Sequence, residues 1–143
     1  MRFEIRDCPE EELDEIYDGL TEHIFQSVPE LRQNKHFDIN KKITDEDGNI
    51  IAGCVANGWW WKAVYVDTLW VSEEYRRKGL GSILLGTVER IAAENGCTLI
   101  HLDTFDFQAK DFYIKQGYEV FGVLENSPEG HCRYYLKKNL KGN

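Results

Sequence analysis

The sequence has no apolar run that approaches the ~20 residues needed for a transmembrane helix. Its first residues, Met1–Cys8, mix charged and apolar side chains and lack the apolar centre of a secretory signal peptide. The 143 residues, 42% of them hydrophobic and 29% charged, fit one globular domain, 1–143, that buries its own core. We therefore expect a cytoplasmic protein with no membrane partner.

Basic residues are in short supply. The chain has 17 Lys and Arg against 25 Asp and Glu, which gives a formal net charge of −8. Nucleic-acid binding requires basic surface, so nucleic acid is not expected as a partner. Ten acidic residues lie between Glu4 and Glu30. They form either a solvated helix face or an acidic rim that attracts cationic amines.

The four cysteines have neither metal-ligand spacing nor a C-x-x-C pair; they are Cys8, Cys54, Cys97 and Cys132. Such a pattern is typical of reduced thiols that pack as small apolar side chains. We expect no metal site and no cysteine nucleophile.

Two common phosphate-binding motifs are also absent. No G-x-x-x-x-G-K-[ST] string occurs, and Leu84 stands where the third glycine of G-x-G-x-x-G would be. Instead, the basic run Arg76–Gly81 follows the apolar run Val64–Val71 and precedes the amphipathic stretch Ser82–Asn95. A helix start offers unpaired N–H groups and a positive dipole end, so this loop predicts a phosphate or pyrophosphate site. The alternative is a connector with a solvated basic face.

Hydrophobic periodicity predicts a single α/β domain with a mixed sheet and the order β-α-β-β-β-α-β-α-β-β. A helical stripe runs from Leu13 to Ile24, and Asp47-Gly48 marks a hairpin. The predicted strands are Arg2–Arg6, Phe37–Thr44, Ile50–Asn57, Lys62–Val71, Thr98–Thr104, Tyr118–Glu125 and His131–Lys137, and the later helices are Ser82–Asn95 and Gln108–Gln116.

Two motifs together resemble those of the GNAT superfamily of N-acetyltransferases. Arg76-x-x-Gly79-x-Gly81 is similar to its acyl-CoA pyrophosphate loop. The stretch from Gln108 to Tyr118 resembles its second motif, with matches at Ala109, Phe112, Tyr113, Gly117 and Tyr118. Asp106 stands where many members carry asparagine. The resemblance implies a GNAT-like sheet, acetyl-CoA as co-substrate, and splayed central strands at Leu69–Val71 and Thr104 that admit the pantetheine arm.

The resemblance also implies which residues bind the cofactor. The backbone N–H groups from Arg77 to Ser82 would take the pyrophosphate. The implied set is Leu69, Trp70, Val71, Arg76, Arg77, Lys78, Gly79, Leu80, Gly81, Ser82, Thr104, Ala109, Phe112 and Tyr113.

Transfer of an acetyl group to a primary amine requires an acid for the leaving thiolate and a way to deprotonate the amine. By resemblance, the Tyr113 hydroxyl faces the thioester sulfur, and Tyr65 occupies a position where many members carry glutamate. Strand alternation places Tyr65, Asp67 and Leu69 on one face, which makes Asp67 a candidate base acting through a water. Asp67 is otherwise a polar strand-end residue. His101, on the next strand, titrates near neutral pH or packs as a core histidine.

The run Trp59-Trp60-Trp61 is either the packed end of a hairpin or an aromatic wall of the acceptor pocket. We expect Trp60, Trp61 and Tyr65 to bind the acceptor, a small-molecule or peptide amine that is cationic. The expected function is direct acetyl transfer in a ternary complex. Two alternatives are a non-catalytic acyl-CoA-binding regulatory module and an enzyme that modifies a macromolecule. A homodimer is possible.

Overall fold

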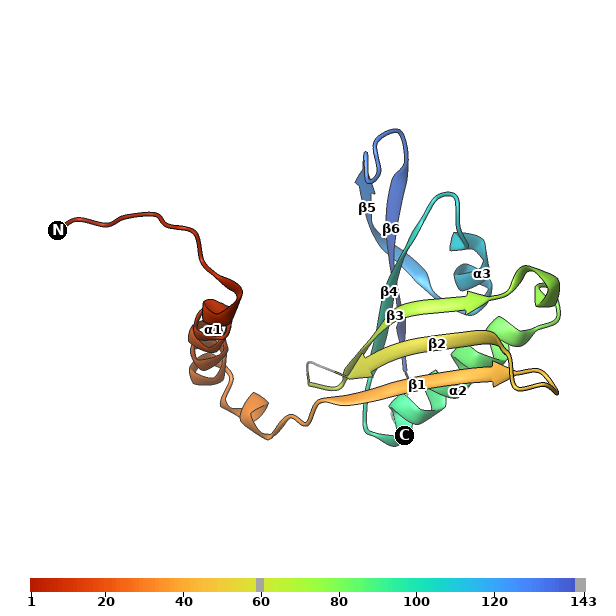
Figure 1. The fold of residues 1–143 in the computed structure, drawn as a ribbon. Coiled ribbons are helices and arrows are strands. Elements are labelled where there is room, and N and C mark those ends of the chain that lie inside the picture. The colour runs from red at the N-terminus through yellow and green to blue at the C-terminus, as the bar shows by residue number, and fades with distance from the viewer. Residues whose placement is uncertain (59–60, 141–143) are drawn as a thin grey trace. The chain divides into compact units, whose positions relative to one another are not determined.

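The computed structural model describes residues 1–58 and 61–140 (Figure 1). The chain divides into two compact units, Met1–Asn34 and Lys35–Asn143, which are described in turn. Within the described ranges, no helix is both long and apolar enough to cross a bilayer. That all 143 residues form one acetyltransferase domain stays a prediction.

The first unit is helical. Helix α1 spans Leu13–Ser27, between short 3-10 turns at Glu10–Glu12 and Pro29–Gln33. The predicted strand Arg2–Arg6 is wrong, because residues 1–9 contain neither helix nor strand. A five-residue alternation supplies suitable side chains, but a strand also requires that its backbone pairs with a neighbouring strand.

The second unit is built on a six-stranded mixed sheet with the order β1-β2-β3-β4-β6-β5 (Figure 1). All neighbouring strands are antiparallel except β3 and β4. The α/β prediction is confirmed, with six strands among the described residues in place of the seven expected. The strands are β1 (Phe37–Thr44), β2 (Ile50–Gly58), β3 (Ala63–Val71), β4 (Leu99–Phe105), β5 (Glu119–Glu125) and β6 (Cys132–Asn139).

Helix α2 (Leu80–Glu94) connects the parallel strands β3 and β4 and covers one face of the sheet. Its buried side chains are Leu84, Leu85, Val88 and Ala92. They share a core cluster with strand residues such as Val64 and Ile100, and each large aliphatic side chain contributes about 1.5–3 kcal/mol when fully buried. The short helix α3 (Lys110–Lys115) adds Tyr113 to the same cluster. The core therefore fixes the ends of α2 and α3 relative to the sheet.

The two central strands separate part of the way along their length. Residues Ala63–Val66 of β3 pair with Leu99–Leu102 of β4, and beyond these residues the two strands are not paired. The expected splay is confirmed. The separation leaves backbone groups of Leu69–Val71 without a β4 partner at the end of β3 that leads into the basic loop.

Candidate active site

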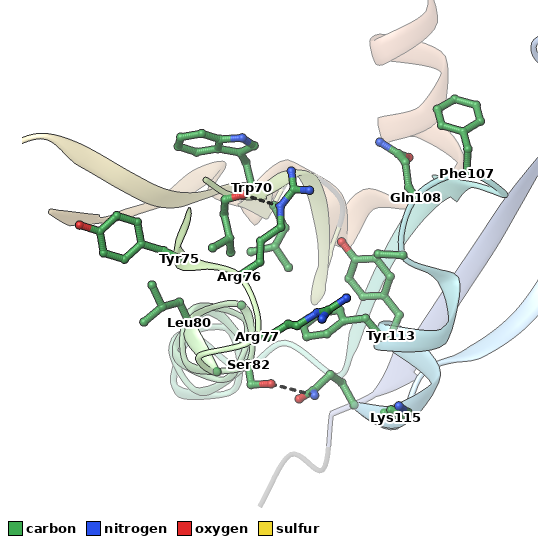
Figure 2. Close-up of a pocket in the computed structure, with 17 residues that line it drawn as sticks. Trp70, Tyr75, Arg76, Arg77, Leu80, Ser82, Phe107, Gln108, Tyr113 and Lys115 are labelled. Atoms are coloured by element: carbon green, nitrogen blue, oxygen red, sulfur yellow. Dashed lines mark hydrogen bonds between the residues drawn. The ribbon is translucent and has the colours of Figure 1, made fainter. Parts of the chain in front are cut away.

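A cavity of about 770 Å³ lies between the end of β3, the basic loop with the start of α2, and α3 (Figure 2). It is lined by Leu69, Trp70, Val71, Tyr75, Arg76, Arg77, Gly79, Leu80, Gly81, Ser82, Phe107, Gln108, Ala109, Phe112, Tyr113, Lys115 and Gln116. Twelve of the fourteen residues proposed for cofactor binding are among them. Segments far apart in sequence therefore form one cavity of the size typical of ligand sites.

The basic loop turns sharply before α2 begins. Arg77 and Gly79 both adopt the left-handed backbone conformation, with φ values of 64° and 79°. Glycine adopts this region without strain, whereas an arginine does so rarely. The Arg76 Nε donates a 3.1 Å hydrogen bond to the carbonyl oxygen of Val71, so its guanidinium is tied to the end of β3 (Figure 2). The loop therefore brings the first turn of α2 to the cavity wall.

The two loop glycines serve different physical needs. Gly79 is the N-cap of α2 and needs its positive φ, while a Cβ atom there would meet nothing within 4 Å. Gly81 has no such backbone requirement, but a Cβ atom would lie 3.2 Å from Cζ of Phe112. Gly79 therefore permits the turn, and Gly81 permits the close approach of α2 and α3.

Tyr113 places a buried hydroxyl at the cavity. Only 7% of the residue is exposed, and its hydroxyl makes no hydrogen bond within the described parts of the chain. Burial, with smaller contributions from Cys54 and Asp103, raises the pKa of Tyr113 to about 12. The hydroxyl therefore stays protonated at neutral pH and is available as a donor to a ligand.

The remaining lining residues were not found from the sequence: Tyr75, Phe107, Gln108, Lys115 and Gln116. Gln116 Nε2 donates a 2.9 Å hydrogen bond to Ser82 Oγ, which ties α3 to the first turn of α2 (Figure 2). Gln108 Oε1 accepts hydrogen bonds from Thr104 Oγ1 and the Phe105 N–H, which anchors the loop after β4. In the sequence, only their position inside the second motif indicated that these two glutamines could lie at the site.

Two residues expected to bind the cofactor lie outside the cavity lining. The Lys78 ammonium lies over the Tyr75 ring, 5.2 Å from its centroid. Thr104 is 4% exposed, because alternation along β4 directs it to the same buried face as Leu102. Both residues were proposed by resemblance to the family, but neither side chain lines the cavity, because Lys78 contacts Tyr75 and Thr104 is buried.

Trp61, expected to form part of an aromatic acceptor wall, is not among the residues that line this cavity. Trp61 adopts φ 28° in the turn before β3, with the Lys62 ammonium 5.6 Å from its ring centroid. The cavity lies at the opposite end of β3, eight residues further along, which corresponds to roughly 26 Å of strand. Trp60 lies outside the described residues.

A β-bulge at Asp67 breaks the expected alternation of β3. Val66 pairs with Ala56 and Thr68 pairs with Val55, so Asp67 is the extra residue. After the bulge the faces are exchanged: Leu69 pairs with the buried Cys54 and lies on the core face. The prediction that Leu69 shares the face of Tyr65 is wrong for this reason. Asp67 itself is exposed and accepts a 2.9 Å hydrogen bond from Thr68 Oγ1.

A polar network lies beside the splay, on β3, β4 and β6. The Tyr65 hydroxyl donates a 2.7 Å hydrogen bond to Asp103 Oδ2, while Arg133 donates two bonds, of 2.9 and 2.7 Å, to Asp103 Oδ1. Burial and the Asp103 carboxylate raise the pKa of Tyr65 to about 12. The sequence analysis missed Asp103 and Arg133, although the β4 alternation separates Asp103 from the buried Leu102 and Thr104.

His101 and Cys54 are the two other titratable side chains considered for catalysis. The His101 ring lies 5.2 Å from that of Tyr65, and burial lowers the pKa of His101, which leaves the imidazole neutral at neutral pH. Burial also raises the pKa of the Cys54 thiol to about 11, so this cysteine is a poor nucleophile. Within the described residues, no group of three or more His, Cys, Asp or Glu side chains is arranged to hold a metal ion.

Comparison with known proteins defines the class of this protein. Residues 3–118 match the family model described as the acetyltransferase (GNAT) family. The chain is 37% identical to a blasticidin-S acetyltransferase of Streptomyces morookaense over 97 residues, which is 66% of this chain and 70% of that protein. It is 28% identical to an acetyltransferase of Agrobacterium fabrum over 98% of this chain and 100% of that protein.

A crystal structure of an acetyltransferase from Bacillus cereus superimposes with a TM-score of 0.88. It shares 34% sequence identity, covering 96% of this chain and 98% of that chain. The chain therefore belongs to the GNAT acetyltransferase family. Together with the cavity at the splayed strands, this membership makes it an acyl-CoA-dependent acetyltransferase.

Proposed function

We propose that this protein transfers the acetyl group of acetyl-CoA to a primary amine by direct attack in a ternary complex. The observation that carries the proposal is one cavity shared by the first turn of α2, the end of β3 that has no β4 partner, and the hydroxyl of Tyr113. These three features supply an anion site, an extended backbone edge and a hydrogen-bond donor. A direct transfer needs no protein nucleophile, and both buried thiols have raised pKa values because of burial.

The chemistry of the lining fits acetyl-CoA from one end to the other. The N–H groups at the start of α2 and the Arg77 guanidinium suit a pyrophosphate. The apolar side chains of Leu69, Val71 and Phe112 suit a pantetheine arm, whose amides can pair with the free edge of β3. The bound thioester supplies the activated acetyl group.

In this proposal, Tyr113 donates its hydroxyl hydrogen to the sulfur as the carbon–sulfur bond breaks. The raised pKa of Tyr113 limits how far its proton moves toward the sulfur. A phenol with a pKa of about 12 is a weaker acid than a thiol with a pKa of ~8.5, so full proton transfer to the free thiolate is uphill. Tyr113 therefore acts mainly as a strong hydrogen-bond donor that stabilises the developing negative charge.

We propose that two residues of β3, Tyr65 and Asp67, interact with the acceptor amine. An amine of pKa ~10.4 is mostly an ammonium at neutral pH and must lose a proton before it attacks. Asp67 is an exposed carboxylate at the bulge, and its charge contributes to the raised pKa of Tyr65. Asp67 either removes the proton through a water or attracts the cationic acceptor. We propose Tyr65 as an acceptor-binding residue.

The acceptor is proposed to be a small cationic molecule or peptide with a free primary amine, and the chain is proposed to act in the cytoplasm. The similarity to a blasticidin-S acetyltransferase supports an amine-bearing small molecule. The test is release of the CoA thiol from acetyl-CoA with a panel of polyamines, aminoglycosides, nucleoside antibiotics, amino acids and basic peptides. Amine-dependent thiol release, with the acetylated amine identified by mass spectrometry, is the expected result. Binding of acetyl-CoA with no thiol release for any amine would contradict the proposal.

A further inference from the structure

Asp103 connects the tyrosines on β3 and α3. Its Oδ2 accepts the Tyr65 hydrogen bond, and its charge contributes to the raised pKa of Tyr113. Val66 is the last β3 residue that pairs with β4; Tyr65 directly precedes it, and Asp103 directly follows its partner Leu102. Tyr65 and Asp103 therefore meet where the strands separate, four residues before the cavity-lining stretch that begins at Leu69.

The two tyrosines belong to opposite faces of the sheet. Tyr113 joins the core cluster on the face covered by α2. Along β4, Ile100 and Leu102 are buried in that core, so alternation directs His101 and Asp103 to the other face. Tyr65 and Arg133 contact Asp103 there. A molecule that approaches the splay from this second face therefore meets the Tyr65–Asp103–Arg133 network.

The hydrogen-bond directions in this network are set by its charges. Arg133 occupies Asp103 Oδ1 with two N–H groups, and its guanidinium lies 5.6 Å from the Phe105 ring centroid and 5.4 Å from that of Tyr135. The Asp103 side chain is only 14% exposed, and its second oxygen takes the Tyr65 hydrogen. Because a hydroxyl has one hydrogen, the Tyr65 oxygen then has only acceptor capacity left.

We propose that the Tyr65 hydroxyl oxygen, oriented by Asp103 and Arg133, accepts a hydrogen bond from the acceptor amine and so makes the enzyme selective for primary amines. This inference rests on the proposed acetyl transfer. A neutral primary amine has two N–H groups: one stays bonded to Tyr65 throughout, and the other hydrogen leaves as a proton to water after the nitrogen attacks the thioester carbon. Tyr65 contacts the substrate, and Asp103 and Arg133 are positioning residues.

The same argument explains the selectivity. A secondary amine has a single N–H, and that hydrogen must leave during amide formation, so its bond to Tyr65 is lost. The proposal needs no proton relay through Tyr65 to Asp103, whose Oδ1 already accepts two hydrogen bonds from Arg133. The network therefore positions an amine that is already neutral.

The test compares two acceptors in five proteins: wild type, Tyr65→Phe, Asp103→Asn, the double variant and the control Tyr135→Phe. The acceptors are the primary amine with the highest turnover in the panel and its N-methyl derivative. Tyr65→Phe removes only the hydroxyl, and we expect about a tenfold loss of kcat/KM for the primary amine, the scale of one hydrogen bond. The N-methyl derivative should lose little, so the preference for the primary amine shrinks. The acetyl-CoA Kd, measured by calorimetry, should not change.

Asp103→Asn keeps the shape of the side chain and reverses one hydrogen bond. The amide oxygen must face the Arg133 donors, so the amide nitrogen faces Tyr65 and donates to it, which occupies the oxygen that the amine needs. We expect the same loss of preference as in Tyr65→Phe, and little further loss in the double variant. Tyr135→Phe is the matched control, because the Tyr135 hydroxyl makes no hydrogen bond within the described residues; it should behave as wild type.

The outcomes separate the two proposals. An unchanged primary-amine preference in Tyr65→Phe overturns the inference while acetyl transfer stands. Additive losses in the double variant overturn the positioning role of Asp103, and an equal loss in Tyr135→Phe shows a general packing effect and overturns it too. A wild-type protein that binds acetyl-CoA but acetylates no amine overturns the proposed function and this inference together.

Discussion

A Cβ atom on Gly81 would lie 3.2 Å from Cζ of Phe112. This close approach joins the first turn of α2 to α3, and both residues line the cavity. The contact matters for function because the proposed pyrophosphate site and Tyr113 are held on these two helices. Their separation sets where a thioester can lie relative to the helix start.

Gly81→Ala should therefore behave differently from Gly86→Ala in the same helix. An exposed helical Gly→Ala change stabilises a protein by about 0.5–1 kcal/mol, and a Cβ on Gly86 meets nothing within 4 Å. We expect that gain at Gly86. At Gly81 the displacement of Phe112 should cancel it and weaken acetyl-CoA binding. Urea unfolding and calorimetry measure both effects; equal stabilisation by the two variants would contradict the packing argument.

Arg77→Glu should weaken acetyl-CoA binding by tenfold or more, because a charge-assisted hydrogen bond contributes about 1.5–3 kcal/mol. Lys78→Glu makes the same charge change one residue away, but Lys78 lies over the Tyr75 ring and outside the cavity lining. Its effect should be smaller and should fade with added salt. Calorimetric Kd values at two ionic strengths provide the comparison. Equal losses would show that only the general field of the loop matters.

Tyr113→Phe should retain acetyl-CoA affinity and lower kcat by on the order of 100-fold, the scale of one lost hydrogen-bond donor to the developing negative charge. Because the pKa of Tyr113 is raised to about 12, the hydroxyl is protonated at every pH below about 11. The wild-type kcat profile should therefore show no limb from this residue between pH 6 and 10. Tyr75→Phe, another cavity tyrosine, is the control and should keep its activity. A near-wild-type kcat for Tyr113→Phe would contradict the proposed role of the Tyr113 hydroxyl in catalysis.

Asp67→Asn distinguishes a base from an electrostatic attractor. If Asp67 deprotonates the amine through a water, kcat/KM should fall and the loss should shrink at high pH, where more amine is neutral. If Asp67 attracts a cationic acceptor, KM for the amine should rise and the effect should weaken with salt. Rate profiles over pH at two ionic strengths separate these cases. A variant identical to wild type in both would exclude Asp67 from the site.

Stability should fall at alkaline pH. The pKa values of Tyr65, Tyr113 and Tyr118 are all raised, mainly by burial, and for Tyr118 also by the Glu89 carboxylate that accepts its hydrogen bond. Above pH ~10 the unfolded tyrosines ionise while the folded ones keep their protons, so unfolding releases protons and becomes easier as pH rises. Urea unfolding from pH 8 to 11 measures the slope. Tyr118→Phe should make it shallower.

Much of the fold was accessible from the sequence because its signals are local. The stripe Leu84, Leu85, Val88 and Ala92 predicts α2, and Asp47-Gly48 predicts the hairpin that joins β1 and β2. The basic loop predicts an anion site because glycine permits a positive φ and a helix start offers free N–H groups. These features need only a few neighbouring residues, so they can be predicted without knowledge of the fold.

The errors came from features that depend on partners. Residues 2–6 alternate as a strand does but form neither helix nor strand. The bulge at Asp67 exchanges the faces of β3, since register is set by pairing with β2 and not by the side chains of β3. Lys78 and Thr104 do not line the cavity. The Lys78 ammonium lies over the Tyr75 ring, and Thr104 is buried on the core face of β4.

By itself the sequence determined the class of this protein, because the loop and the second motif are short patterns of neighbouring residues that resemble those of the GNAT family, to which the chain belongs. Only the tertiary structure decided the arrangement around the acceptor. Asp103 is 38 residues from Tyr65 and 30 from Arg133, and no local pattern links them. The parallel pairing of β3 with β4 and the antiparallel pairing of β4 with β6 bring the three together, since side chains on neighbouring strands of one face lie within hydrogen-bonding reach.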